Sequence, residues 1–259
     1  MTATPDQFTD QPTNAKPTAH PARWSAAVLD TIEMLLHEIG PTVYRLHSTP
    51  APKMFDPYAG TLERLHARFT PLGWNVFGSE IEYEWASQHP NTMHGDCVEV
   101  MGSMAMSGEL VDAVVTSPTY GNRMADQSML PGVGAGARHT YNTYAFKLGR
   151  RLSALNTGAT QWDRKTGRAY RRLHRRAWQA AWEILKHDGL LIVNVSDHIR
   201  DGEIAPVVDW HRDTITEITD RPPTADVKVD TPRQRQGANG DLRATHEHVM
   251  MWVKDDLPF

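Results

Sequence analysis

The sequence of 259 residues contains a single cysteine, Cys97, so no disulfide can form within the chain. Scarce cysteine is typical of proteins in a reducing compartment, and we expect a cytoplasmic protein. No run of about 18 or more apolar residues occurs, so we expect no membrane-spanning helix and no membrane partner. The N-terminus shows no basic and apolar regions of a secretory signal peptide, so none is expected.

Two common phosphate-binding patterns, G-x-x-x-x-G-K-[ST] and G-x-G-x-x-G, are also missing. The formal net charge of −4 gives no sign of nucleic-acid binding by itself. The apolar fraction of 40% is enough for a sizeable core, which predicts one large domain with or without a small insert.

What the chain does contain is an alternation of strand and helix patterns. The pattern predicts helices over residues 21–40, 62–69, 81–89, 170–186 and 207–212. It predicts strands over residues 53–56, 74–78, 91–94, 111–116, 190–195, 214–219 and 245–253. This order indicates a mostly parallel sheet with helices on both faces and an antiparallel hairpin at the end. Residues 221–243 are rich in Pro, Gly and Arg and are expected to be irregular.

Three acidic residues stand where the first three predicted strands end, namely Asp56, Glu80 and Asp96. In an open parallel sheet the ligand crevice lies beyond the carboxyl ends of the strands, so these side chains should lie close together. Glu80, 24 positions after Asp56, suits the two hydroxyls of a ribose, and Asp96 could accept a hydrogen bond from a purine amine. The pattern therefore predicts a nucleoside pocket without a phosphate cradle, and S-adenosylmethionine is a nucleoside of that kind.

Five segments resemble motifs of the amino-group DNA methyltransferases, the N4-cytosine and N6-adenine enzymes. Residues 56–63 read D-P-Y-A-G-T-L-E against the family's D-P-F-A-G-T-G-T, and residues 116–120 read T-S-P-T-Y against T-S-P-P-Y. Residues 20–24, 182–191 and 246–249 resemble the family's H-P-A-x-[FW], W-x-x-x-L-K-P-G-G-x-L and H-E-x-[VI] segments. Leu62 and Thr119 depart from the glycine and proline that are usual at their positions.

The resemblance implies a Rossmann-like class I methyltransferase fold with a mostly parallel seven-stranded sheet. Residues 1–20 are rich in Thr, Pro, Gln and Asp and are expected to form a disordered tail. The resemblance covers a cofactor-binding half (21–121) and the remainder of the domain (169–259), and the basic insert between them (122–168) is the candidate for target recognition. The residues it implies for S-adenosylmethionine are Asp56, Pro57, Tyr58, Ala59, Gly60, Thr61, Glu80, Asp96 and Thr116. The catalytic residues it implies are Ser117, Pro118, Thr119 and Tyr120.

The expected chemistry is direct methyl transfer to the exocyclic amine of a base that has left the DNA stack. The Ser117 hydroxyl and the Pro118 carbonyl would accept from the amine and localise its lone pair, and Tyr120 would stack on the base. A serine at the head of this motif favours cytosine N4 over adenine N6, which stays the alternative. Methylation at a ring carbon would need a Pro-Cys nucleophile, and Cys97 is interpreted as a small filler beside the cofactor site.

Between Lys147 and Arg176 the chain has ten basic residues and one acidic residue, Asp163, a formal charge of +9. We interpret this segment as a phosphate-binding surface for double-stranded DNA. The predicted DNA contacts are Arg150, Arg151, Arg164, Lys165, Arg168, Arg171, Arg172 and Arg175. His246 and His248 lack further ligands at metal-binding spacing, so no metal is predicted.

Two other functions remain open on the sequence: an RNA or protein methyltransferase on the same fold, and an inactive nucleic-acid-binding homologue. The sequence also does not indicate an oligomeric state, a recognition sequence, or whether a companion restriction nuclease exists.

Overall fold

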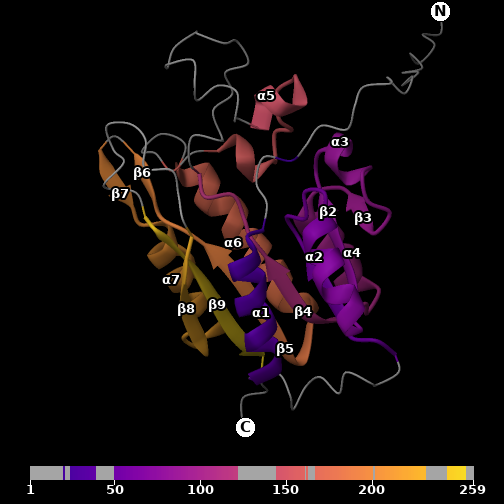
Figure 1. The fold of residues 1–259 in the computed structure, drawn as a ribbon. Coiled ribbons are helices and arrows are strands. Elements are labelled where there is room, and N and C mark those ends of the chain that lie inside the picture. The colour runs from indigo at the N-terminus through magenta and orange to yellow at the C-terminus, as the bar shows by residue number, and fades with distance from the viewer. Residues whose placement is uncertain are drawn as a thin grey trace, which may run out of the picture.

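The computed structural model describes residues 20, 24–38, 50–121, 144–160, 162, 167–200, 202–231 and 244–254. These residues form a seven-stranded sheet with helices on both faces and a separate two-stranded hairpin (Figure 1). The strands of the main sheet are β1 (Lys53–Asp56), β2 (Asn75–Glu80), β3 (Thr92–His94), β4 (Val111–Thr116), β5 (Leu185–Val195), β8 (Ala225–Asp230) and β9 (His246–Lys254). The helices are α1 (Ala26–Glu38), α2 (Glu63–Phe69), α3 (Tyr83–Ala86), α4 (Cys97–Met106), α5 (Tyr144–Leu148), α6 (Gly167–Ile184) and α7 (Val207–Thr219). Two 3-10 turns, η1 (Thr70–Leu72) and η4 (Thr157–Ala159), and the small hairpin of β6 (His198–Arg200) and β7 (Glu203–Ala205) complete the fold.

The strand order of the main sheet is β3-β2-β1-β4-β5-β9-β8. The first five strands run parallel, and β9 lies antiparallel between β5 and β8. This is the Rossmann-like class I methyltransferase arrangement, so the predicted fold class is confirmed. The order reverses direction between β1 and β4, and a ligand crevice forms at such a switch point, beyond the carboxyl ends of the strands.

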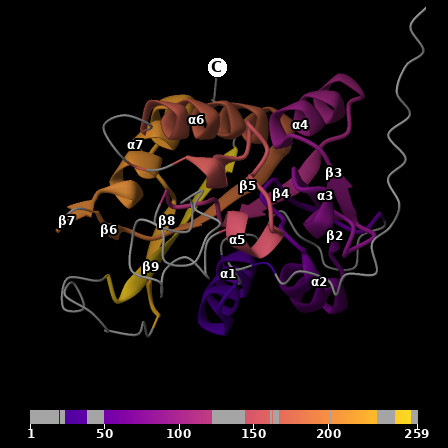
Figure 2. The same cartoon turned by 90° about the horizontal axis from the view of Figure 1, so that it is seen from above.

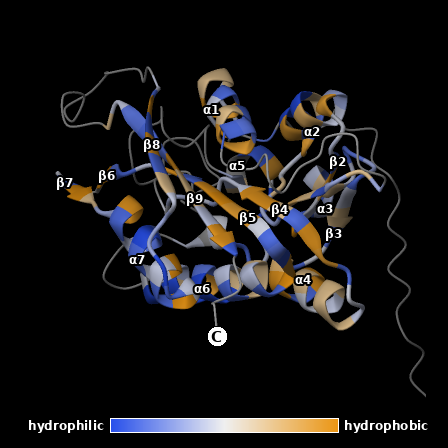
Figure 3. Ribbon diagram, turned by 90° about the horizontal axis from the view of Figure 1, so that it is seen from below, coloured by the Kyte–Doolittle hydropathy of each residue, from blue (hydrophilic) through white to orange (hydrophobic). Residues whose placement is uncertain are grey.

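Two apolar cores lie on the two faces of the sheet. Helices α1 and α2 cover one face, and α4, α6 and α7 cover the other (Figure 2). Successive residues of β4 alternate between the cores, with Ala113 and Val115 facing α1 and α2, and Val114 facing the opposite helices. Figure 3 shows the central strands as hydrophobic ribbons between the helical layers. Burial on both faces holds the central strands, and hence their carboxyl ends, in fixed positions.

Helix α1 lies within the predicted helix over 21–40 and starts after Ser25, whose Oγ accepts a hydrogen bond from the Val28 N–H at 3.2 Å. The predicted helix over 81–89 is shorter in the structure, where α3 covers only Tyr83–Ala86.

Two predictions near the C-terminus are wrong. Residues 214–219, predicted as a strand, form the last turns of α7, because Thr214, Ile215 and Thr219 lie on one buried helical face. The real edge strand is β8, inside the segment 221–243 that was predicted to be irregular. The antiparallel pair at the end of the sheet therefore exists, but it consists of β8 and β9.

Helix α4 was not predicted, although Asp96 accepts from the N–H groups of Val98 and Glu99 and so caps it. The boundary between α6 and β5 also differs from the prediction, because α6 ends at Ile184 and β5 begins at once with Leu185. Asp188 lies within β5 with a φ of 59°, where the register of the sheet shifts. Among the described residues, no helix has the length and apolar character needed to cross a membrane.

Candidate active site

One pocket lies beyond the carboxyl ends of the parallel strands and encloses about 710 Å³ of space that is partly open to solvent. Its lining combines the predicted acids Glu80 and Asp96 with Ser117 and Thr119 of the predicted catalytic motif. The structure thus brings the two predicted halves of the site together around a single cavity. The other residues that line it are His20, Pro57, Tyr58, Ile81, Trp85, Gly95, Cys97, Val98, Tyr144, Leu155, Asn156, Thr157, Leu173 and Arg176.

Asp56 lies buried beside this pocket and ties the end of β1 to the end of β4. Its Oδ1 accepts from the Thr116 hydroxyl at 2.6 Å and from the Tyr58 N–H at 3.0 Å. Burial raises the pKa of Asp56 to about 7, against the opposing effect of these two hydrogen bonds. Asp56 therefore holds the turn that follows β1 and can carry a proton near neutral pH.

Glu80 ends β2 and fixes the same turn from the other side. Its two carboxylate oxygens accept from the N–H of Gly60 at 3.1 Å and from the N–H of Glu82 at 2.9 Å. Burial raises its pKa to about 7. Gly60 has a φ of +53°, and a Cβ there would lie 3.1 Å from the ring of His20. Both the backbone conformation and the close ring favour glycine at this position.

Asp96 and Cys97 form the pocket wall at the start of α4. The Asp96 Oδ1 caps the helix, as described above, while the residue also lines the pocket. Burial raises the pKa of the Cys97 thiol to about 12. A thiol with so high a pKa is a poor nucleophile near neutral pH, because the thiolate is the reactive form.

The Ser117 hydroxyl belongs to a hydrogen-bond network that the sequence did not reveal. Its Oγ lies 3.0 Å from the Tyr120 hydroxyl and 3.4 Å from the Asn194 Nδ2. The Asn194 amide also donates to the Tyr120 hydroxyl at 3.1 Å and to the Glu247 carboxylate at 2.7 Å. Tyr120 packs its ring against the core on the α4 and α6 face and is not among the pocket-lining residues. That Tyr120 stacks on the base stays a prediction.

A second chain of hydrogen bonds reaches the catalytic motif through Thr119. The Tyr170 hydroxyl donates to the Thr119 carbonyl at 2.7 Å and lies 2.9 Å from the His211 Nε2. The Trp178 indole N–H donates to the His211 Nδ1 at 3.1 Å, so the Nε2 carries the imidazole hydrogen. Burial lowers the pKa of His211 well below its usual range, which keeps the ring neutral. This chain braces the loop after β4 against α6 and α7.

The residues predicted to contact DNA differ in whether the structure describes them and in which side chains they contact. Arg164 and Lys165 lie outside the described residues. Arg150 pairs with Glu82 and Glu84, and Arg175 pairs with Glu217. That these two residues contact DNA stays a prediction. The Arg171 guanidinium lies 4.9 Å from the centre of the Trp162 ring.

Exposed arginines remain on one face of α6. Arg168 and Arg172 are exposed, and within the described part of the chain neither forms an ion pair. Arg176, one helical turn further on, is also exposed and lines the pocket. The spacing of four residues places all three side chains on the same face of the helix. Arg151 is exposed on the segment before α6.

Sequence reasoning missed several pocket residues, because they come from segments that are far apart in the chain. Trp85 is buried, lines the pocket and packs edge-on against His20, with 4.4 Å between the ring centres. Tyr144, Asn156 and Thr157 lie within the insert predicted for target recognition, yet they line the same pocket as Glu80.

No protein-family model matches the chain, and no curated protein matches it either. Among solved structures, the SAM-dependent methyltransferase from Agrobacterium tumefaciens is similar at 11% identity and a TM-score of 0.48, over 88% of this chain and 62% of that one. TrmN from Thermus thermophilus matches at 10% identity and a TM-score of 0.44, over 88% of this chain and 48% of that one. The magnesium protoporphyrin IX methyltransferase from Synechocystis matches at 10% identity and a TM-score of 0.47, over 88% of this chain and 84% of that one. This chain thus spans less than two thirds of the length of the first two proteins, and it is the observed strand order, rather than these likenesses, that identifies the class I methyltransferase fold.

Proposed function

We propose that the chain is an S-adenosylmethionine-dependent methyltransferase that modifies the exocyclic amine of a base in double-stranded DNA. The observation that carries the proposal is the shared pocket, in which Glu80 and Asp96 stand on the same cavity as Ser117. Acids at the strand ends suit a nucleoside, and a hydroxyl acceptor next to them suits an amine that must be held for reaction.

The pocket residues fit S-adenosylmethionine. Gly60 leaves room at the turn after β1, where a side chain would collide with His20. Glu80 keeps acceptor capacity for ribose hydroxyls, since each of its oxygens accepts only one backbone N–H among the described residues. The second oxygen of Asp96 remains for a purine amine, because the Oδ1 caps α4. Bound S-adenosylmethionine supplies a methyl group that its sulfonium activates.

The role of the catalytic motif is to hold the amine. An exocyclic amine is a weak nucleophile, because its lone pair is delocalised into the ring. Acceptance of its N–H groups by the Ser117 Oγ and the Pro118 carbonyl localises that lone pair. Asn194 donates toward the Ser117 Oγ, and Glu247 fixes the Asn194 amide, so the hydroxyl has a defined position before the base arrives.

The arginine face of α6 favours a nucleic acid over a small amine as the substrate. Arg168, Arg172 and Arg176 lead along one helix face to the pocket, where Arg176 stands among the lining residues. Guanidinium groups that pair with none of the described carboxylates suit phosphates that flank a base in the pocket. The resemblance of the catalytic motif favours DNA, and its serine favours cytosine N4, with adenine N6 as the second candidate.

Mass spectrometry of nucleosides tests the proposal. DNA and RNA are isolated from a methylation-deficient bacterial host that expresses the chain or its Ser117→Ala variant. We expect N4-methylcytosine in DNA with the parent chain and at least tenfold less with the variant, whose thermal stability serves as the control for folding. N6-methyladenine instead would move the preferred base to adenine, and methylation confined to RNA would contradict a DNA substrate. Absence of every methylated base, with binding of S-adenosylhomocysteine retained, would identify an inactive binding protein.

A further inference from the structure

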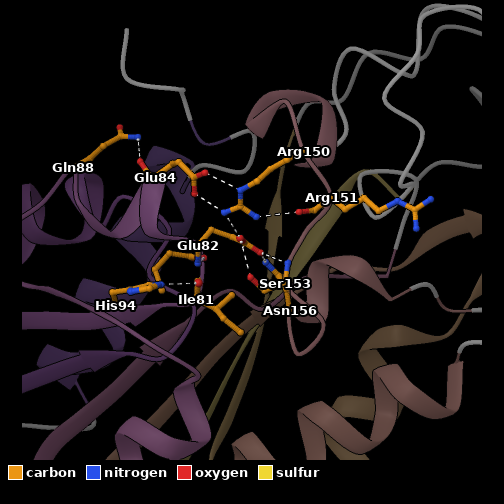
Figure 4. Close-up of polar contacts among 10 residues, drawn as sticks. Ile81, Glu82, Glu84, Gln88, His94, Arg150, Arg151, Ser153 and Asn156 are labelled. Carbon is orange, nitrogen blue, oxygen red and sulfur yellow. Dashed lines mark hydrogen bonds and ion pairs between the residues drawn. The ribbon is translucent and has the colours of Figure 1, made fainter. Parts of the chain in front are cut away.

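Glu82 lies in the short connection between β2 and α3 and is completely buried. Figure 4 shows that its carboxylate faces a segment from the far side of the insert. It accepts from the Ser153 N–H at 2.8 Å, the Ser153 hydroxyl at 3.1 Å and the Asn156 amide at 2.7 Å. The Arg150 guanidinium adds an ion pair at 2.8 Å. A buried carboxylate with four donors from one segment holds that segment in place, because undocking would leave the charge without partners.

The segment that Glu82 holds also builds the pocket. Tyr144, Asn156 and Thr157 line the same cavity as Glu80. The Asn156 amide is fixed at both ends, since its Oδ1 accepts from the Gly158 N–H at 2.7 Å while its nitrogen donates to Glu82. Tyr144 is buried and packs edge-on against Trp85, with 6.0 Å between the ring centres.

Glu82 is connected to the opposite wall of the pocket as well. Its N–H donates to the Glu80 Oε1 at 2.9 Å, so one residue fixes both the acid at the end of β2 and the segment that faces it. The contacts on the two sides of Glu82 therefore set the width of the pocket between Glu80 and Asn156.

We propose that residues 144–160 form a wall of the cofactor pocket, with Glu82 and Arg150 as its positioning residues. The inference rests on the proposed function, because it takes the pocket to be the site of S-adenosylmethionine. Under this proposal, residues 144–160 of the insert contribute to cofactor binding instead of DNA recognition. Cofactor affinity should then depend on Glu82 and Arg150, although neither residue needs to touch the ligand.

Local charge argues against the competing role of Arg150 as a phosphate contact. Glu84 binds the same guanidinium through both oxygens, at 2.8 and 2.6 Å, in addition to the contact with Glu82. Two carboxylates and one guanidinium leave a net negative charge, which repels phosphate. Exposed α6 arginines are better placed for that role.

The experiment measures S-adenosylhomocysteine binding by isothermal titration with the full chain and its variants. In Glu82→Gln an amide nitrogen replaces one acceptor oxygen and the charge is lost, so we expect at least tenfold weaker binding. Arg150→Gln, at a side chain that is 41% exposed, should weaken binding three- to tenfold with little risk to folding. Glu217→Gln, which breaks the Arg175 pair on the surface, is the matched control and should change affinity less than twofold.

Two further readouts separate cofactor positioning from general stability and from DNA binding. Both variants should raise the KM for S-adenosylmethionine and leave kcat at saturation within about threefold of the parent. Arg150→Gln should leave the salt dependence of DNA binding unchanged. Unaltered S-adenosylhomocysteine affinity in folded Glu82→Gln and Arg150→Gln would overturn the inference while leaving the proposed function in place. A smaller salt dependence in Arg150→Gln with unaltered cofactor affinity would make Arg150 a phosphate contact and also overturn it. If the parent chain itself does not bind S-adenosylhomocysteine, the proposed function fails and the inference fails with it.

Discussion

Two buried carboxyl groups at the strand ends, Asp56 and Glu80, have pKa values raised into the neutral range. Burial raises the pKa of each to about 7, above the ordinary values of 3.8 and 4.5. In the ligand-free protein, a raised carboxyl pKa means that the folded state binds more protons than the unfolded state between these limits. The contribution of these groups to stability is therefore present below about pH 4 and is lost as pH rises through 7.

Cofactor binding should respond to pH in the opposite direction. The ionised form of Glu80 accepts ribose hydroxyls, and a cationic sulfonium favours ionised carboxylates nearby. We expect the affinity for S-adenosylmethionine to increase about tenfold between pH 6 and pH 8, since one ionisation near 7 is coupled to binding. Titration in buffers of different ionisation enthalpy should also detect proton release at pH 6.5. Glu80→Gln should bind weakly at every pH, and a steep pH dependence retained in this variant would assign the effect to another group.

Leu62 shows how one residue can depart from a family pattern and still fit the fold. It stands where the related motif has glycine, and its φ is 55°, in the left-handed region. That conformation costs a side-chain-bearing residue about 1–2 kcal/mol. Its side chain is only 3% exposed and packs in the core that contains α1 and α2. Burial of the leucine side chain offsets the backbone cost.

This balance predicts that Leu62→Gly destabilises the protein rather than relaxing it. Loss of a buried leucine side chain costs about 2–5 kcal/mol, against about 1–2 kcal/mol of relieved strain. The midpoints of these ranges differ by about 2 kcal/mol, so the unfolding free energy should fall by about that amount. Chemical denaturation of the two proteins measures the difference. Equal or greater stability of the variant would show that the strained backbone outweighs the packing of the side chain.

At the scale of single elements, the buried and exposed faces of α6 make different contacts. Its buried face packs on the core through residues such as Ala177 and Trp178, and Tyr170 braces the loop after β4. The exposed face carries Arg168, Arg172 and Arg176, while Arg175 is occupied by Glu217.

The exposed arginines of α6 should contribute to the salt dependence of DNA binding, whereas Arg175, which is paired with Glu217, should not. Each phosphate contact contributes about 0.9 to the slope of log affinity against log salt concentration. Arg168→Gln combined with Arg172→Gln should therefore reduce the slope by about 1.8. Arg175→Gln should leave it unchanged, since that side chain is already paired on the surface. DNA binding measured between 50 and 200 mM salt compares the variants, and equal slopes in all of them would remove α6 from the DNA-binding surface.

Helices and strands were predicted correctly where a single sequence pattern was present. They were predicted wrongly where two sequence patterns favoured different structures. The β-branched residues of segment 214–219 favour a strand, but the burial of Thr214, Ile215 and Thr219 at helical spacing decides for α7. For β8 the alternation of Ala225, Val227 and Val229 was present in the sequence, yet the neighbouring prolines suggested a loop. Partner strand β9 decides the outcome, because a strand forms only where another can pair with it.

At the scale of the whole molecule, strand order explains why distant residues meet. Because β1, β2, β3 and β4 run parallel, their carboxyl ends lie at one edge of the sheet, where the pocket opens. Strand β9 is antiparallel, so its first residues reach the same edge, and Glu247 can contact Asn194 at the end of β5. A parallel sheet thus brings residues from the ends of separate strands together in one site.

The sequence by itself determined the class of the fold, the acids at the strand ends and the position of Ser117, because these depend on local pattern and on the rule that parallel strands end together. Only the tertiary structure decided the opposite wall of the pocket, where His20, Tyr144 and Asn156 arrive from other parts of the chain. It also decided which arginines are paired, since Glu82 lies 68 positions before Arg150 in the sequence and only 2.8 Å from it in space. Contacts of this kind depend on packing between segments, and no local pattern records which side chains packing will bring together.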